Sequence, residues 1–175
     1  MKKILTLFAI VGLVAFTSCE GPEGPPGPPG YDGESANKVF EIFNKDFGFN
    51  EDDGFNISGT FNPRIADAST VLVYRLIGTI DANTPIWQLI PRTIYLTNNR
   101  ELDYDFDFSK VDFKIYARAN YDLETTPEYL DNQTFRIIIL PASFTSKSVS
   151  KTDYSDYNAV IKKYNIDDSN VQKLN

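Results

Sequence analysis

The chain has 175 residues, a formal net charge of −7, no histidine and a single cysteine. The absence of histidine removes the usual general base and the usual zinc ligand, and a lone cysteine cannot form an internal disulfide. The acidic balance argues against nucleic acid as a partner, and the length suits one domain with a substantial core.

The first 18 residues have the pattern of an export signal. Two lysines precede an apolar run at residues 4–16, and small polar residues follow it. A run of this length is too short to span a bilayer stably, and its flanks are typical of a cleaved secretory signal. We therefore predict a signal peptide over residues 1–18, removed before Cys19.

The segment Phe16-Thr17-Ser18-Cys19 closes this signal and contains the only cysteine. It resembles the lipobox of bacterial lipoproteins, whose cysteine thiol takes a diacylglycerol group before the signal is removed. The resemblance implies that Cys19 carries fatty acyl chains such as palmitate, and two or three such chains anchor a protein firmly to a membrane. The alternative is a buried free thiol within an uncleaved helix.

A Gly-Pro-rich run follows Cys19. Its glycines recur at every third position: Gly21, Gly24, Gly27, Gly30 and Gly33. This is collagen-like spacing, but the run is short and its charged residues are all acidic, so three parallel chains would repel one another. We predict a lipidated cysteine and stalk over residues 19–36, and we do not expect a trimer through the Gly-Pro run. The segment is similar to that of small bacterial lipoproteins with a collagen-like run before a β domain of unsettled function.

Residues 37–147 are predicted to form an antiparallel β-sandwich-like domain, which makes the fold class mostly all-β. Alternating apolar and polar residues mark eight short strands. They are expected at residues 39–47, 55–61, 70–77, 86–90, 93–97, 102–108, 111–119 and 134–140. The strands at 70–77 and 134–140 are apolar on both faces, which predicts central strands that are covered on both sides.

A short helix and a tail are predicted over residues 148–175. Ser155 is the expected N-cap, and apolar residues from Tyr157 to Tyr164 recur at helical spacing. We expect this helix to close one end of the core. Order should fade beyond a turn at Asp167-Asp168-Ser169.

Two groups of carboxylates are candidates for calcium binding, because oxygen ligands suit this ion. Glu51, Asp52 and Asp53 crowd one turn, and they are the stronger candidate. Asp103, Asp105 and Asp107 alternate along one strand, where side chains on a flat face do not converge on one ion. Neither group matches an EF-hand loop, and no other cofactor is expected.

The same strand offers paired carboxylates for glycoside hydrolysis, which needs two acids about 5 to 9.5 Å apart. Glu101 with Asp103 or Asp105 is the candidate pair, although alternate acids on an exposed strand are usually only solvated.

Four aromatic residues are candidates for stacking on sugar rings: Trp87, Tyr95, Tyr116 and Tyr121. Trp87 lies in an apolar strand, where a core position is the more common interpretation.

These observations favour a cell-envelope lipoprotein, acylated at Cys19, that presents a non-catalytic β domain with a binding or structural role. A carbohydrate-binding surface module is the first alternative, and an acid-pair glycoside hydrolase is the second. We expect the protein to be lipid-anchored to a bacterial membrane, the outer one, with a glycan or an envelope protein as its partner.

Overall fold

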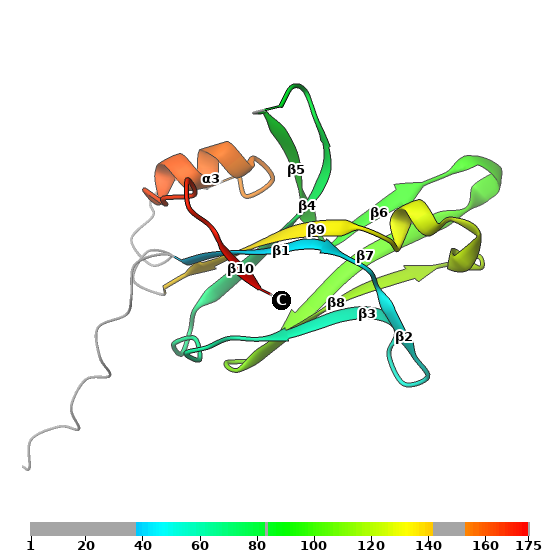
Figure 1. The fold of residues 1–175 in the computed structure, drawn as a ribbon, viewed down its shortest axis with the longest axis horizontal. Helices are drawn as coiled ribbons and strands as arrows, with labels where there is room; N and C mark the ends of the chain where they lie inside the picture. Colours follow the sequence, from blue (N-terminus) through cyan, green and yellow to red (C-terminus); the bar gives the residue numbers. More distant parts are fainter. Residues whose placement is uncertain (1–37, 83, 142–152, 175) are drawn as a thin grey trace, which may run out of the picture. The chain divides into compact units, whose positions relative to one another are not determined.

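The computed structural model describes residues 38–82, 84–141 and 153–174. The predicted signal peptide (1–18), Cys19 and the stalk (19–36) lie outside the described residues. The described part is built from two five-stranded sheets and one short α-helix, which confirms the prediction of an all-β, sandwich-like domain (Figure 1). Within it, no helix has the length and apolar character that a membrane crossing requires.

The two sheets differ in which parts of the chain they use. Sheet A has the spatial order β10 (Gln172–Leu174), β1 (Lys38–Lys45), β9 (Gln133–Leu140), β4 (Thr70–Thr79) and β5 (Pro85–Ile90). Sheet B has the order β2 (Gly48–Asn50), β3 (Gly54–Thr60), β8 (Asp112–Ala119), β7 (Glu101–Phe108) and β6 (Arg92–Tyr95). All neighbours pair antiparallel except β1 and β10, which run parallel.

The main hydrophobic core lies between the sheets. Sheet A contributes side chains such as Val73, Phe135 and Ile137, and sheet B contributes Leu102 and Ile115, all of them fully buried. Burial of this kind stabilises by about 1.5–3 kcal/mol for each large apolar side chain. This core is what holds the two sheets face to face.

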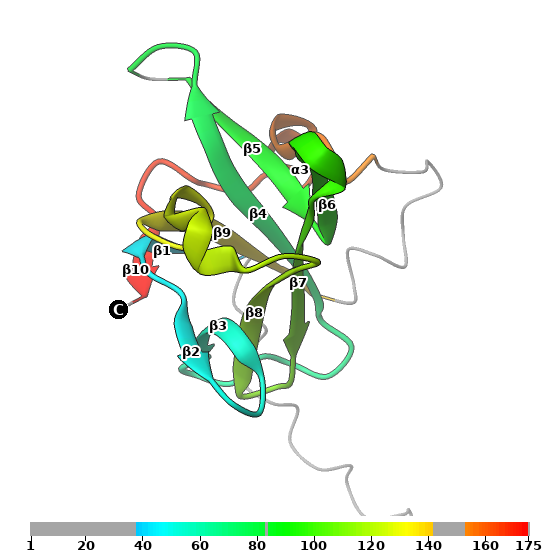
Figure 2. The same cartoon turned by 90° about the vertical axis from the view of Figure 1, so that its right-hand side faces the viewer.

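A second hydrophobic cluster lies on the outer face of sheet A. The alternate residues of the central strands, among them Leu72, Tyr74 and Ile138, pack there against Val160 and Tyr164 of the C-terminal segment. That segment contains the helix α3 (Tyr157–Lys163), which lies over sheet A on the side away from sheet B (Figures 1 and 2). The prediction that β4 and β9 are covered on both faces is therefore confirmed.

Polar contacts also hold the C-terminal segment on the sheet. Arg136 of β9 donates from Nε to Glu41 at 3.0 Å, and from Nη1 to Asp168 at 3.0 Å and to the Tyr157 hydroxyl at 2.6 Å. Its guanidinium also lies 4.6 Å from the centre of the Trp87 ring. Arg136 therefore joins β1, α3 and the residues after α3 through one side chain.

The structure corrects three expectations about the C-terminal segment. The N-cap of α3 is Asp156, not Ser155: its Oδ1 accepts a hydrogen bond from the backbone N–H of Ala159 at 3.0 Å. The helix covers a face of sheet A rather than one end of the core. The tail does not simply fade, since residues Gln172–Leu174 form β10 alongside β1.

Candidate functional site

The outer faces of the two sheets differ in character. The outer face of sheet A lies under α3, whereas neither hydrophobic cluster of the described residues includes an outward side chain of sheet B. The outward side of β6, β7 and β8 carries polar and charged side chains instead. We call this surface the open face, and it consists of Thr93, Asp103, Asp105, Asp107, Lys114, Tyr116 and Arg118.

Strand alternation and register bring these side chains together. In β7 the residues Leu102 and Tyr104 are buried, so that the aspartates between them point outward. Asp103 lies opposite Thr93 on one side and Arg118 on the other, Asp105 opposite Tyr116, and Asp107 opposite Lys114. Each outward aspartate therefore has a hydroxyl or a cation directly across from it.

A depression of about 340 Å³ lies on this part of sheet B. It is lined by Pro91, Arg92, Thr93, Asp103, Tyr104, Asp105 and Arg118. The two carboxylates (Asp103 and Asp105) and the two guanidinium groups (Arg92 and Arg118) belong to exposed residues. Thr93 is half-buried, and its hydroxyl donates a hydrogen bond to Asp103. The depression therefore offers hydrogen-bond acceptors and donors side by side.

Tyr116 lies at the centre of the open face and is largely covered. Its ring has the guanidinium of Arg118 at 4.4 Å and the ammonium of Lys114 at 5.9 Å, which leaves the residue only 8% exposed. Its hydroxyl donates to Asp107 at 2.5 Å, and this hydrogen bond raises the pKa of the Tyr116 phenol, with burial adding to the effect. Tyr116 therefore organises the charges around it and does not present a ring to a ligand.

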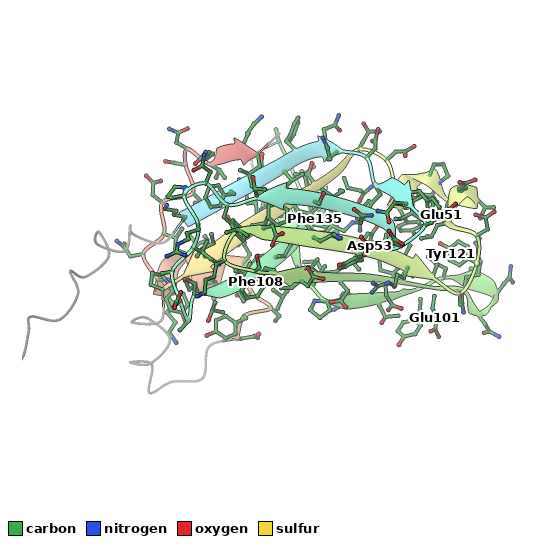
Figure 3. All side chains as sticks on the ribbon, turned by 90° about the horizontal axis from the view of Figure 1, so that it is seen from below. Glu51, Asp53, Glu101, Phe108, Tyr121 and Phe135 are labelled. Atoms are coloured by element: carbon green, nitrogen blue, oxygen red, sulfur yellow. The ribbon has the colours of Figure 1, made fainter. Side chains whose placement is uncertain are left out.

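The turn between β2 and β3 contains the predicted calcium ligands Glu51, Asp52 and Asp53. The side chain of Asn50 organises this turn, accepting hydrogen bonds from the backbone N–H groups of Asp52 at 3.1 Å and Asp53 at 2.8 Å. Asp53 reaches across to Lys114, whose Nζ lies 2.5 Å from its Oδ2, and this contact raises the pKa of Lys114. Glu51 and Asp53 of this turn are labelled in Figure 3.

The described residues contain no group of three or more aspartate, glutamate or cysteine side chains close enough to hold a metal ion. This applies to both predicted calcium groups. In the second group, Asp103 and Asp107 accept hydrogen bonds from Thr93 and Tyr116, which gives them partners within the protein. The calcium prediction therefore gains no support from the structure.

The predicted acid pair is only partly brought to the depression. Asp103 and Asp105 line it, but Glu101, at the start of β7 (Figure 3), is not among its lining residues. All three are exposed. The surface thus offers two solvated carboxylates in an open depression rather than an enclosed pair.

The four candidate aromatics do not form one platform. Trp87 lies on sheet A, half-buried, with its ring centre 5.6 Å from that of Tyr157. Tyr121 is half-buried after β8, with the guanidinium of Arg100 4.9 Å from its ring centre. Tyr95 is 76% exposed and follows Thr93 on the same side of β6. Tyr95 is therefore the one ring of the four that is freely presented.

Arg75 of β4 is a candidate that the sequence analysis missed. It is 8% exposed, which places a charged side chain in the interior of a sandwich. The available signal was a single charge inside an otherwise apolar strand.

Comparisons with protein-family models, curated proteins and solved structures find no match to this chain.

Proposed function

We propose that the protein is a cell-envelope lipoprotein, anchored through acyl chains on Cys19, whose sandwich domain is a non-catalytic binding module. The observation that carries the binding role is the contrast between the two outer faces. One is occupied by α3, and the other displays a polar depression of about 340 Å³. Binding sites are concave surfaces with a few convergent polar groups.

The chemistry of the depression favours a hydroxyl-rich ligand, which makes a glycan the specific candidate. Carboxylates accept hydrogen bonds and guanidinium groups donate them, so Asp103, Asp105 and Arg118 could satisfy both functions of sugar hydroxyls. Tyr95 supplies an exposed ring on the same side of β6. These polar groups and this ring are sufficient for a weak surface interaction with a polysaccharide.

The anchor is tested by membrane fractionation and intact mass of the full-length protein, wild type beside Cys19→Ala. We expect the wild type in the membrane fraction with the mass of the chain from Cys19 plus lipid, and the variant released. Wild-type protein without added lipid mass would contradict the anchor.

The binding face is tested by polysaccharide binding with the variants Asp103→Asn and Asp105→Asn. Glu124→Gln is the matched control, because Glu124 is an exposed acid outside the open face. We expect saturable binding that weakens about tenfold in the first two variants and is unchanged in the control. Equal binding by the wild type and all three variants would refute the proposal that the open face binds the glycan. Glycan turnover that is lost in Asp105→Asn would refute the non-catalytic role.

A further inference from the structure

The side chain of Arg75 enters the space between the two sheets. In β4, Val71 and Val73 belong to the core between the sheets, and strand alternation places Arg75 on the same side. Its neighbours across the strands are Phe135 of β9, which is fully buried, and Gln88 of β5. A guanidinium group is thus held where the pattern calls for an apolar residue.

This guanidinium has no carboxylate partner among the described residues. No acidic oxygen of this part of the chain lies within ion-pair distance of it, and its hydrogen bond there runs from Nε to Oε1 of Gln133 at 2.8 Å. The rings of Tyr104 and Tyr129 lie 4.5 Å and 6.0 Å from its Cζ. Burial lowers the pKa of Arg75, and these two tyrosines partly oppose that effect, but a guanidinium remains charged at neutral pH.

The surroundings fix the orientation of the guanidinium. The Nε2 of Gln133 donates to the backbone carbonyls of Glu128 at 3.0 Å and Asp131 at 2.6 Å, which leaves Oε1 to face Arg75. The hydroxyl of Tyr104 donates to the carbonyl of Tyr129 at 2.6 Å and so ties the stacked ring to the same loop. Arg75 is therefore held by its Nε edge, and the two Nη atoms are left without a described partner.

The Nη atoms also remain in contact with solvent. Among the described side chains, the only nitrogen or oxygen that is both sealed from solvent and unpartnered is Nε1 of Trp87. A second cation lies on the same side: Arg92 is exposed and pairs across the strands with Tyr104, the residue on which Arg75 stacks. Arg92 forms no ion pair with a described residue either.

We propose that Arg75 is the binding position for a carboxylate group of a small acidic ligand, taken up between the sheets beside Tyr104. Although its Nη atoms still contact solvent, most of the guanidinium is buried without a counter-charge among the described residues, and a bound carboxylate would supply that partner. The two Nη atoms form the fork that carboxylates engage with two parallel hydrogen bonds. Arg75 does not itself line the depression, but Tyr104 and Arg92 do, so this position adjoins the depression from the side between the sheets. The proposal does not depend on glycan binding at the open face.

The test is calorimetric titration of the full-length lipidated protein in detergent micelles with glucuronate, glucose, acetate and chloride at constant ionic strength. The Nε–H signal of Arg75 in a ¹⁵N-arginine spectrum, assigned from its loss in Arg75→Lys, reports the site directly. We expect saturable binding of glucuronate, a shift of this signal, and no effect of glucose. Acetate as effective as glucuronate would identify a bare carboxylate ligand, and a stronger effect of glucuronate would identify a sugar acid.

Three variants complete the experiment. Arg75→Lys keeps the charge without the fork and should weaken binding at least tenfold, and Arg75→Met should abolish it. Arg100→Lys is the matched control, because Arg100 also stacks on a tyrosine ring but at a turn, and it should bind as the wild type does. The absence of glucuronate binding to the wild type, an equal effect of chloride, or unchanged binding by a folded Arg75→Lys would each overturn the proposal.

Discussion

Gly59 of β3 lies directly opposite Phe113 of β8, and replacing it with alanine should destabilise the domain through one identifiable clash. A Cβ at position 59 would lie 2.5 Å from Cζ and 2.8 Å from Cε1 of the Phe113 ring. The ring has no room to retreat, since Phe113 is only 3% exposed and its ring centre is 5.3 Å from that of Phe61. The glycine is thus required by packing.

The expected loss follows from two opposing effects. Overpacking of a core costs about 1–3 kcal/mol, and replacing glycine with alanine recovers about 0.4–1 kcal/mol by restricting the unfolded chain. The net loss in free energy of unfolding for Gly59→Ala therefore centres on about 1.3 kcal/mol, which for a domain of this size is a fall in Tm of roughly 3–5 °C. Urea and thermal denaturation followed by circular dichroism would measure both quantities.

Gly78→Ala is the control, because a Cβ there meets nothing within 4 Å. Its stability should stay within about 0.5 kcal/mol of the wild type. A double-mutant cycle with Phe113→Leu should show a favourable coupling of about 1 kcal/mol, since leucine removes the clashing ring atoms. Equal Tm values for the two glycine variants, or strictly additive losses in the cycle, would refute this reasoning.

Two further predictions concern the N-cap of α3 and three buried tyrosines. Asp156→Ala should lower the free energy of unfolding by about 1 kcal/mol, because the N-cap hydrogen bond is lost. Asp156→Ser can still cap the helix and should keep most of the wild-type stability in urea denaturation. Burial raises the pKa of Tyr74, Tyr104 and Tyr157, so the fold favours their neutral form. The contribution of these neutral tyrosines to the free energy of unfolding should therefore be fully present below pH 10. Above pH 10 it should fall by at most about 1.4 kcal/mol per pH unit for each tyrosine. A Tm that stays constant up to pH 11 would contradict this.

The sequence predicts the body of the sandwich because alternation records which side of each strand is buried. All eight expected strands are present, with ends that differ by a few residues. The strands β2 and β10 were missed, since three residues are too few to show alternation and each forms only because a partner strand is beside it. Likewise, strands that are apolar on both faces indicate that something covers the outer face of sheet A, but they do not indicate that α3 is the element that covers it.

The candidate site shows the same limit. Alternation correctly places Asp103 and Asp105 outward, and it places Tyr116 outward as well. It does not reveal that Arg118 and Lys114 fold over the Tyr116 ring, because that depends on neighbours within one surface. Arg75 is visible in the sequence as a charge in an apolar strand. That no described carboxylate pairs with it follows only from the arrangement of the loop around Gln133.

The three-residue strand β10 determines whether β1 has a free edge. It pairs with Phe40, Glu41 and Ile42, so that β1 lies inside sheet A between β9 and β10. A chain shortened before Gln172 would expose these backbone groups next to Phe43, which is already 56% exposed. Free strand edges beside apolar side chains are templates for intermolecular pairing. We therefore expect Gln172–Leu174 to shield this edge from intermolecular pairing, and a tag placed next to them needs a spacer that leaves β10 in place.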